Sequence, residues 1–150
     1  MSERAVREAR DEDREELVHL VSQFFEEEGI DVAVKQITRN LMVMLADERA
    51  TFLVCEGEGQ IFGFVTATAT HGLEYGWAAE IEDLYIRPEM RGRGISYILL
   101  AAAEDWCRDR GIADIQVVLT ATGRKEQGLE RFYQRHGYRN EGRLLMVKAL

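Results

Sequence analysis

One segment decides the fold of this chain: Glu80-Ile81-Glu82-Asp83-Leu84-Tyr85-Ile86-Arg87-Pro88-Glu89-Met90-Arg91-Gly92-Arg93-Gly94-Ile95-Ser96. Its pattern predicts an acidic strand over 78–86, a turn at Arg87-Pro88, and a glycine-rich loop that leads directly into an amphipathic helix. A loop of this kind leaves backbone N–H groups unpaired at a helix N-terminus, where the helix dipole favours negative charge. The segment therefore predicts a phosphate-binding loop.

The composition of the loop supports this prediction. Glycines at 92 and 94 allow the backbone to approach a ligand closely, and Arg91 and Arg93 add positive charge.

The strand before the loop has an irregular pattern. Strict alternation of polar and apolar residues fails at Glu82-Asp83, two adjacent polar residues inside an otherwise apolar strand. A β-bulge explains such a break, because it interrupts the period of two and frees backbone groups. We expect a bulge at this position.

Length and composition limit the alternatives. The 150 residues, 46% of them hydrophobic, predict one domain over 1–150. No apolar run approaches the roughly 20 residues of a membrane span, and the charged N-terminus lacks a signal-peptide core, so we expect a cytoplasmic protein without a membrane partner. Cys55 and Cys107 lie far apart, and the three histidines share no ligand spacing, so no metal site is expected.

The charge of the chain is acidic and localised. A net charge of −8 argues against a nucleic-acid partner, which normally binds a basic face. Residues 8–31 contain ten acids and two bases. The acids are Glu8, Asp11, Glu12, Asp13, Glu15, Glu16, Glu26, Glu27, Glu28 and Asp31. They indicate either a solvated helix face or a field that attracts a cationic substrate.

The remaining elements are predicted from hydrophobic periodicity and from residues that typically begin or end helices and strands. Residues 5–9 suit a short strand; Asp11 is expected to cap a first helix that Gly29 ends, and Asp31 to cap a second. The apolar stripes expected on three helices are Leu17, Leu20, Val21, Phe24 and Phe25; Val34, Ile37, Leu41, Met44 and Leu45; and Ile95, Ile98, Leu99, Ala102 and Trp106. Further strands are expected at 51–55, 60–67, 115–119 (a central strand) and 144–147, with a turn at 56–59, a loop at 71–76 and a helix through 129–136.

The loop resembles the coenzyme-A-binding motif of the GNAT N-acetyltransferase superfamily, Gln/Arg-x-x-Gly-x-Gly/Ala. The pattern falls on Arg91, Gly94 and Ser96, with serine where the family has glycine or alanine. The later Phe132-Tyr133-x-x-x-Gly137-Tyr138 is a second landmark of that family. The resemblance implies an α+β GNAT-like domain with a mixed central sheet flanked by helices, in the order β-α-α-β-β-β-α-β-α-β.

The resemblance also implies how acetyl-CoA, the expected cosubstrate, is bound. The backbone N–H of Leu84 would contact the thioester carbonyl, and the backbone of Ile86 would pair with the pantetheine arm. The full set of cofactor-binding residues implied is Leu84, Tyr85, Ile86, Arg91, Gly92, Arg93, Gly94, Ile95 and Ser96.

Three residues are catalytic candidates: the resemblance implies Glu80 and Tyr133, and Glu82 lies two residues beyond Glu80, on the same face of the strand. Glu82 or Glu80 would act as general base on the amine, with an ordered water as the third possibility. Tyr133 matches the tyrosine that protonates the departing thiolate in relatives, although it also fits an apolar helix face. His71, Glu74 and Trp77 lie in the segment with which relatives shape the acceptor site.

The predicted function is transfer of an acetyl group from acetyl-CoA to a primary amine, by direct attack in a ternary complex. The acidic N-terminal helices favour a small cationic amine. The alternatives are acetylation of a protein N-terminus or lysine, and a non-catalytic acyl-CoA sensor. A homodimer is possible, since dimers are common among relatives.

Overall fold

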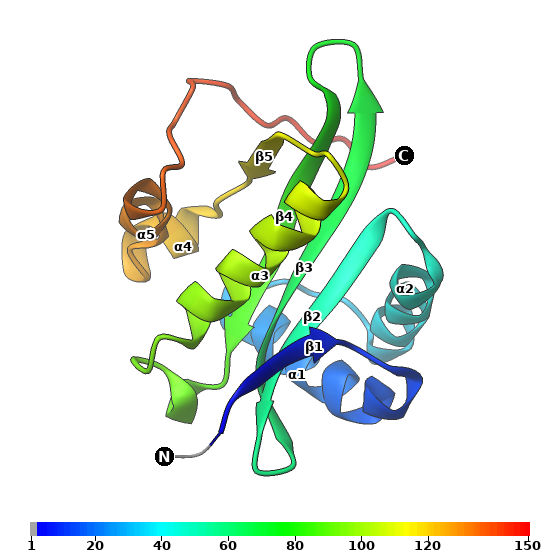
Figure 1. Ribbon diagram of the computed structural model, residues 1–150. Coiled ribbons are helices and arrows are strands. Elements are labelled where there is room, and N and C mark those ends of the chain that lie inside the picture. The colour runs from blue at the N-terminus through cyan, green and yellow to red at the C-terminus, as the bar shows by residue number, and fades with distance from the viewer. Residues whose placement is uncertain (1–2) are drawn as a thin grey trace. The chain divides into compact units, whose positions relative to one another are not determined.

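The computed structural model of the chain describes residues 3–150. Its strands β1 (Ala5–Glu8), β2 (Ala50–Gly57), β3 (Gln60–Gly72), β4 (Gly76–Ile86) and β5 (Asp114–Val117) form a sheet in the order β1-β2-β3-β4-β5 (Figure 1). The pairs β1–β2, β2–β3 and β3–β4 are antiparallel, and β4–β5 is parallel. The predicted mixed sheet of an α+β fold is confirmed.

The chain divides into two compact units, a first that ends at Val117 and a second over Val118–Leu150. The first contains the whole sheet and the helices α1 (Arg14–Glu28), α2 (Val34–Ala46) and α3 (Ile95–Asp109), with short 3₁₀ turns at η1 (Asp11–Asp13) and η2 (Pro88–Met90). The expectation of a single domain over 1–150 stays a prediction.

Helices cover both faces of the sheet. On one face, α1 and α2 bury Leu17, Leu20 and Leu41 in a cluster with Phe52 of β2 and Phe64 of β3. Residues that alternate with these two on the strands point to the opposite face, along which α3 runs (Figure 1). The acidic strand β4 therefore lies between two helical layers.

The predicted helix caps are wrong, while the predicted helix end is right. Asp11 begins η1, and the N-cap of α2 is Ala33, without a side-chain hydrogen bond. Gly29, with φ of 69°, ends α1 as expected. Asp13 precedes α1, and its carboxylate accepts instead from the N–H of Arg10 at 2.8 Å.

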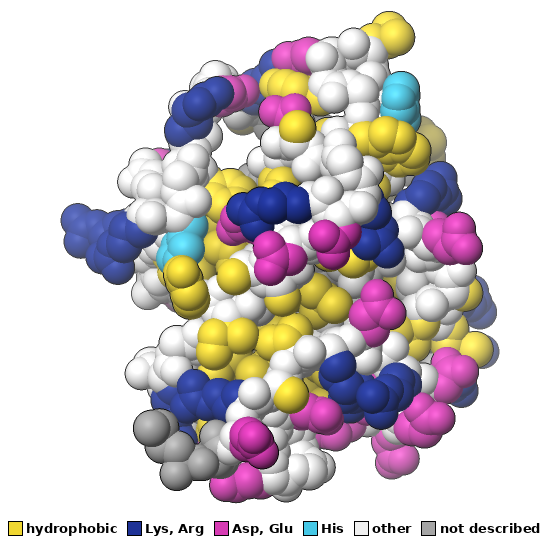
Figure 2. Space-filling model, viewed as in Figure 1, with side chains coloured by type: hydrophobic (Ala, Val, Ile, Leu, Met, Phe, Trp, Pro, Cys, Tyr) yellow, Lys and Arg dark blue, Asp and Glu magenta, His cyan; other side chains and the backbone are white. Residues whose placement is uncertain are grey.

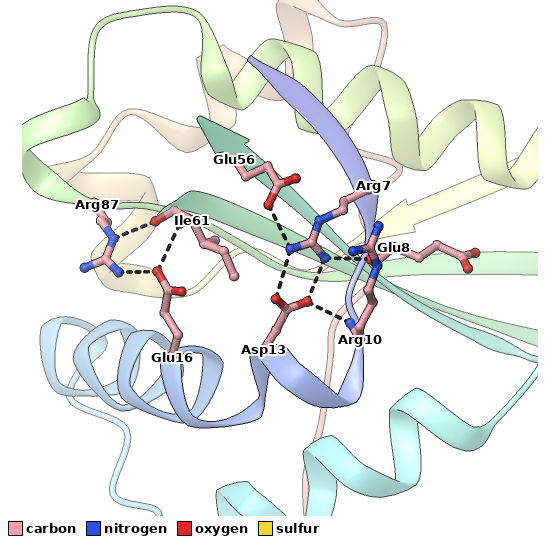
Figure 3. A network of polar contacts seen from close by, with 8 residues as sticks. All are labelled: Arg7, Glu8, Arg10, Asp13, Glu16, Glu56, Ile61 and Arg87. Atoms are coloured by element: carbon pink, nitrogen blue, oxygen red, sulfur yellow. Dashed lines mark hydrogen bonds and ion pairs between the residues drawn. The ribbon is translucent and has the colours of Figure 1, made fainter. Parts of the chain in front are cut away.

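Ion pairs attach the start of α1 to the sheet (Figure 3). Arg7 of β1 donates to both oxygens of Asp13, at 2.7 and 2.9 Å, and to Glu56 of β2 at 2.8 Å. These hydrogen bonds raise the pKa of Arg7 and lower the pKa of Asp13. Part of the acidic N-terminal segment is thus paired with arginines, which neither interpretation of its charge foresaw.

The predicted stripe of α2 is confirmed at Ile37 and Leu41 but not at Val34, and the buried face of α3 is rotated relative to the predicted stripe. The side chain of Val34 is 59% exposed, because it lies in the first turn of α2, and the buried contacts of that helix centre on Ile37 and Leu41. In α3, Ile98 is 37% exposed. The buried positions of α3 are Ile95, Leu99, Leu100, Ala103, Trp106 and Cys107.

Two hairpins join β2, β3 and β4. The first turns at Glu58 and Gly59, both with positive φ (52° and 76°), as the predicted turn at 56–59 requires. The expected loop over 71–76 is wrong in extent, because β3 continues to Gly72 and β4 begins at Gly76. His71 pairs with Trp77 across this longer hairpin, which adds ladder hydrogen bonds that a loop would lack.

The second unit is helical where it is regular. It contains α4 (Ala121–Glu126), which the sequence did not predict, and α5 (Leu129–Arg135), which it did. The hydroxyl of Thr120 caps α4 by accepting from the N–H of Gly123 at 3.0 Å. The expected strand at 144–147 is wrong, because residues 136–150 form no helix or strand. An apolar run by itself makes no strand without a ladder partner.

The expected strand at 115–119 is present as β5, but it lies at an edge of the described sheet and not in its centre. Over residues 3–150, no helix combines the length and apolar character that crossing a bilayer requires.

Candidate active site

The predicted bulge is present in β4. Asp83 lies opposite Thr66 and Ile81 lies opposite Ala67, so Glu82 is an extra residue without a partner on β3. The broken alternation of the sequence was the correct signal, because a bulge places two successive side chains out of the regular period.

The bulge brings three carboxylates to one face of the sheet. The hydroxyl of Thr66 donates to Asp83 at 2.6 Å, and the hydroxyl of Thr68 donates to Glu82 at 2.6 Å. Glu80 lies directly opposite Thr68 and shares its face. We call Glu80, Glu82 and Asp83 the acidic face. The sequence analysis did not predict a role for Thr66 and Thr68. The available signal was their spacing of two residues, which places both on one face of the strand that precedes the acidic strand.

Burial and mutual repulsion change the acidity of this group. Burial raises the pKa of Glu80 above its ordinary value, and the negative charges of Glu82 and Asp83 raise it further. Burial also raises the pKa of Asp83, against the effect of the Thr66 hydrogen bond, which lowers it. A carboxylate with a raised pKa is a stronger base than one in water.

One edge of β4 is open beyond the bulge. β5 pairs with β4 only along Ala78–Ile81, so within the described part of the chain residues 83–86 have a strand partner on β3 alone, and the bulged Glu82 has none. Backbone groups that face the other edge are available to an extended ligand, in the manner of strand addition. Leu84, Tyr85 and Ile86 all belong to this open stretch.

The loop from Arg87 to Ser96, called the donor loop below, follows the open edge. Gly92 and Gly94 adopt φ of 74° and 79°, which glycine tolerates best, and a side-chain carbon built at either would meet no atom within 4 Å. Gly94 is the N-cap of α3, and no side chain caps this helix end. The backbone N–H groups of this helix end therefore receive no side-chain cap, which leaves them for an anion.

The two arginines of the loop differ in their surroundings. Arg93 is exposed and donates to the carbonyl of Glu89 at 3.3 Å. Arg91 is bound to Glu27 of α1 at 2.7 Å, so its charge is compensated. A third arginine, Arg4, donates to the carbonyl of Arg93 at 2.6 Å, a contact that no local sequence pattern indicated.

Comparison with known protein families shows to which family the chain belongs. Residues 7–138 match the profile of the Acetyltransferase (GNAT) family. The chain belongs to this family. The resemblance found in the sequence of the donor loop is thereby confirmed over nearly the whole chain.

Curated relatives of this GNAT chain carry names of N-acetyltransferases. An aminoglycoside N(6')-acetyltransferase of Stenotrophomonas maltophilia is 32% identical over 57% of this chain and 56% of its own length. An aminoalkylphosphonate N-acetyltransferase of Salmonella typhimurium is 30% identical over 71% of this chain and 67% of its own. An uncharacterized N-acetyltransferase of Methanocaldococcus jannaschii is 32% identical over 66% of this chain. The matches span about half of the first two relatives, 45% of the M. jannaschii protein and 56% of the S. maltophilia enzyme.

Solved structures share the GNAT fold. An integron cassette protein from the mobile metagenome of Cole Harbour Salt Marsh is 26% identical, with a TM-score of 0.82 over 97% of this chain and 90% of its own. An aminoglycoside N-acetyltransferase solved with CoA has a TM-score of 0.86 over 99% of this chain and 96% of its own, at 16% identity. At that identity the likeness shows the fold alone.

Tyr133 belongs to the second unit. Its side chain is buried, and its ring packs edge-on against Phe132 at 5.1 Å and Tyr138 at 5.3 Å between centroids. The landmark Phe132-Tyr133-x-x-x-Gly137-Tyr138 therefore forms a small aromatic cluster. The assignment of Tyr133 as general acid stays a prediction.

The hairpin residues lie apart from the acidic face. His71 and Trp77 contact each other edge-on, with 5.2 Å between ring centroids, and Glu74 lies in the turn between them. Trp77 alternates in phase with Ala79 and Ile81, whereas Glu80 points to the opposite face of β4. The structure therefore does not bring His71 and Trp77 together with the two glutamates.

Proposed function

We propose that this GNAT chain transfers an acetyl group from acetyl-CoA to the amine of a small cationic compound. The observation that carries the proposal is the continuity of three features along one segment: the bulge at Glu82, the open edge over 82–86, and the uncapped N-terminus of α3. An extended, phosphate-bearing thioester fits such a segment, with its phosphates at the helix end and its acyl group at the bulge.

The donor loop would bind the phosphates through its backbone. The N–H groups around Gly92, Gly94 and Ser96 would donate to phosphate oxygens, assisted by the exposed charge of Arg93. In the open stretch, Leu84, Tyr85 and Ile86 would contribute backbone groups. A donor from Leu84 aimed at the thioester oxygen would be worth roughly 3 to 4 kcal/mol at the transition state.

The acidic face would prepare the acceptor. An alkylamine with a pKa near 10.4 must lose a proton before it attacks, at a cost of about 4 to 5 kcal/mol at pH 7. The raised pKa of Glu80 favours it as the base, whereas Glu82 is held by Thr68. The amine nitrogen would then attack the acyl carbon and lose its second proton to solvent, the carbon–sulfur bond would break, and the Tyr133 hydroxyl would give its proton to the departing thiolate and recover one from solvent.

Two observations support a cationic acceptor. A hollow of about 280 Å³ between α1 and α2 includes Phe25, Glu26 and Asp31 in its wall, an aromatic ring beside two carboxylates. Both helices cover the sheet face to which the acidic face belongs. Two relatives named above are acetyltransferases of amines, an aminoglycoside and an aminoalkylphosphonate. The cytoplasmic location and a homodimer stay predictions.

The proposal is tested by thiol release from acetyl-CoA across a panel of polyamines, aminoglycosides, aminoalkylphosphonates and lysine peptides, with CoA affinity measured separately by calorimetry. We expect turnover with a small cationic amine and weaker turnover with neutral amines. Tight CoA binding without turnover on any amine would instead support the non-catalytic sensor. Turnover restricted to peptides would support the protein acetyltransferase.

A further inference from the structure

Helix α1 contacts the donor loop at both of its ends. Near its start, Glu16 accepts from the guanidinium of Arg87 at 3.0 Å and from the N–H of Ile61 at 3.0 Å (Figure 3). Near its end, Glu27 pairs with Arg91 at 2.7 Å. The two glutamates are eleven residues apart, about three helical turns, and therefore lie on one face of α1. Their partners are the arginines on either side of η2.

The side chain of Arg91 makes three contacts. Its Nε donates to the carbonyl of Ile86, the last residue of β4, at 3.0 Å. Its Nη2 donates to both carboxylate oxygens of Glu27, at 2.7 and 3.0 Å. The guanidinium carbon lies 5.5 Å from the centre of the Tyr85 ring, which is itself packed against Phe24 of α1. The hydrogen bonds to Glu27 raise the pKa of Arg91 above its ordinary value.

These contacts direct the Arg91 side chain away from the phosphate-binding end of the loop. Tyr85 and Phe24 belong to the sheet face covered by α1, whereas α3 runs along the opposite face. On the face drawn in Figure 2, dark blue basic side chains and magenta acidic side chains are interspersed. The guanidinium of Arg91 thus belongs to a link between α1 and the sheet.

We propose that Glu27 is a positioning residue for the donor loop, which it holds through Arg91 in the conformation that presents the N–H groups of Gly92 and Gly94 to the cofactor. The inference rests on the proposed function, and it assigns to Arg91 a role other than direct phosphate binding. The link is made at Arg91, immediately before Gly92. Because glycine loses more conformational entropy than other residues when its backbone is ordered, holding the loop at this position matters most.

The direction in which CoA affinity changes when Glu27 is neutralised separates this positioning role from a simple electrostatic one. Removing the negative charge of Glu27 near an anionic ligand would by itself tighten CoA binding. Releasing Arg91 to bind phosphate directly would tighten it as well. Loss of loop order would instead weaken binding, because the loop must then be ordered when CoA binds, which costs conformational entropy.

The test is calorimetric titration of the full chain with CoA, with melting temperature and circular dichroism as checks of folding. Glu27→Gln should weaken CoA binding about fivefold, the size expected for one partly exposed ion pair. Arg91→Met should weaken it similarly, and Glu27→Gln should have no further effect in the Arg91→Met background. Glu15→Gln, an exposed acid on the same helix, is the matched control and should leave the affinity unchanged.

Two results would overturn the proposal. Unchanged or tighter CoA binding by Glu27→Gln would show that Glu27 does not position the loop, while leaving the proposed function intact. No CoA binding by the wild-type chain would refute the proposed function and this inference together, so the two failures are distinguishable.

Discussion

The hydroxyl of Thr66 donates a hydrogen bond to the carboxylate of Asp83, with 2.6 Å between the oxygens, at the bulge of β4. The contact attaches the first residue after the bulge to the neighbouring strand. It also holds a carboxylate in a half-buried position beside Glu82, whose charge raises the pKa of Asp83 in addition to the larger effect of burial. The bulge is therefore maintained at an electrostatic cost.

Asp83→Asn should stabilise the fold at neutral pH. A carboxylate whose pKa is raised by folding binds protons more tightly in the folded state, so its contribution is favourable below its ordinary pKa and is lost as the pH rises through the folded pKa. Asparagine keeps an oxygen that accepts from Thr66 and removes the charge. The melting temperature should rise by a few degrees at pH 7 and not at pH 3.

Asp114→Asn, at the exposed start of β5, is the matched control for loss of one negative charge. A lower melting temperature for Asp83→Asn at pH 7 would show that the charge itself stabilises the bulge.

Glu80→Gln and Glu82→Gln should differ in kind. If Glu80 is the base, Glu80→Gln should lower kcat/KM by about a hundredfold or more. Glu82→Gln should remain active and shift the acidic limb of the pH–rate profile to lower pH, because removal of a neighbouring negative charge lowers the pKa of Glu80. The opposite pattern would assign the base to Glu82, and two active variants would favour an ordered water.

Gly94→Asp should abolish CoA binding in calorimetry. The substitution adds strain at φ of 79° and places a negative charge where phosphate is expected. Gly111→Asp, at φ of 70° beyond the other end of α3, adds similar strain without touching the donor loop. If Gly94→Asp binds CoA as well as Gly111→Asp does, the phosphates are not bound at this helix end.

Tyr133→Phe should lower kcat about tenfold to a hundredfold while leaving the CoA dissociation constant unchanged, because only protonation of the leaving thiolate is lost. Tyr138→Phe, which removes a hydroxyl from the ring in contact with Tyr133 at 5.3 Å, is the matched control. Equal turnover in the two variants and the wild type would remove Tyr133 from the reaction.

The local sequence pattern predicted those features whose backbone requirements involve only neighbouring residues. The end of α1 at Gly29, the turn at Glu58-Gly59 and the bulge at Glu82 all followed from short-range backbone requirements. The caps predicted at Asp11 and Asp31 are wrong, since Asp11 begins η1 and the N-cap of α2 is Ala33, without a side-chain hydrogen bond.

The family, the bulged acidic strand and the glycine loop could all be predicted from the sequence, because each is encoded by neighbouring residues whose backbone preferences act locally. The tertiary structure decided which charges meet. Thr66 and Thr68 reached the acidic face through strand register, and Glu27 reached Arg91 although 64 positions separate them in the chain. Contacts of this length depend on how helices and strands pack, and no local period records them.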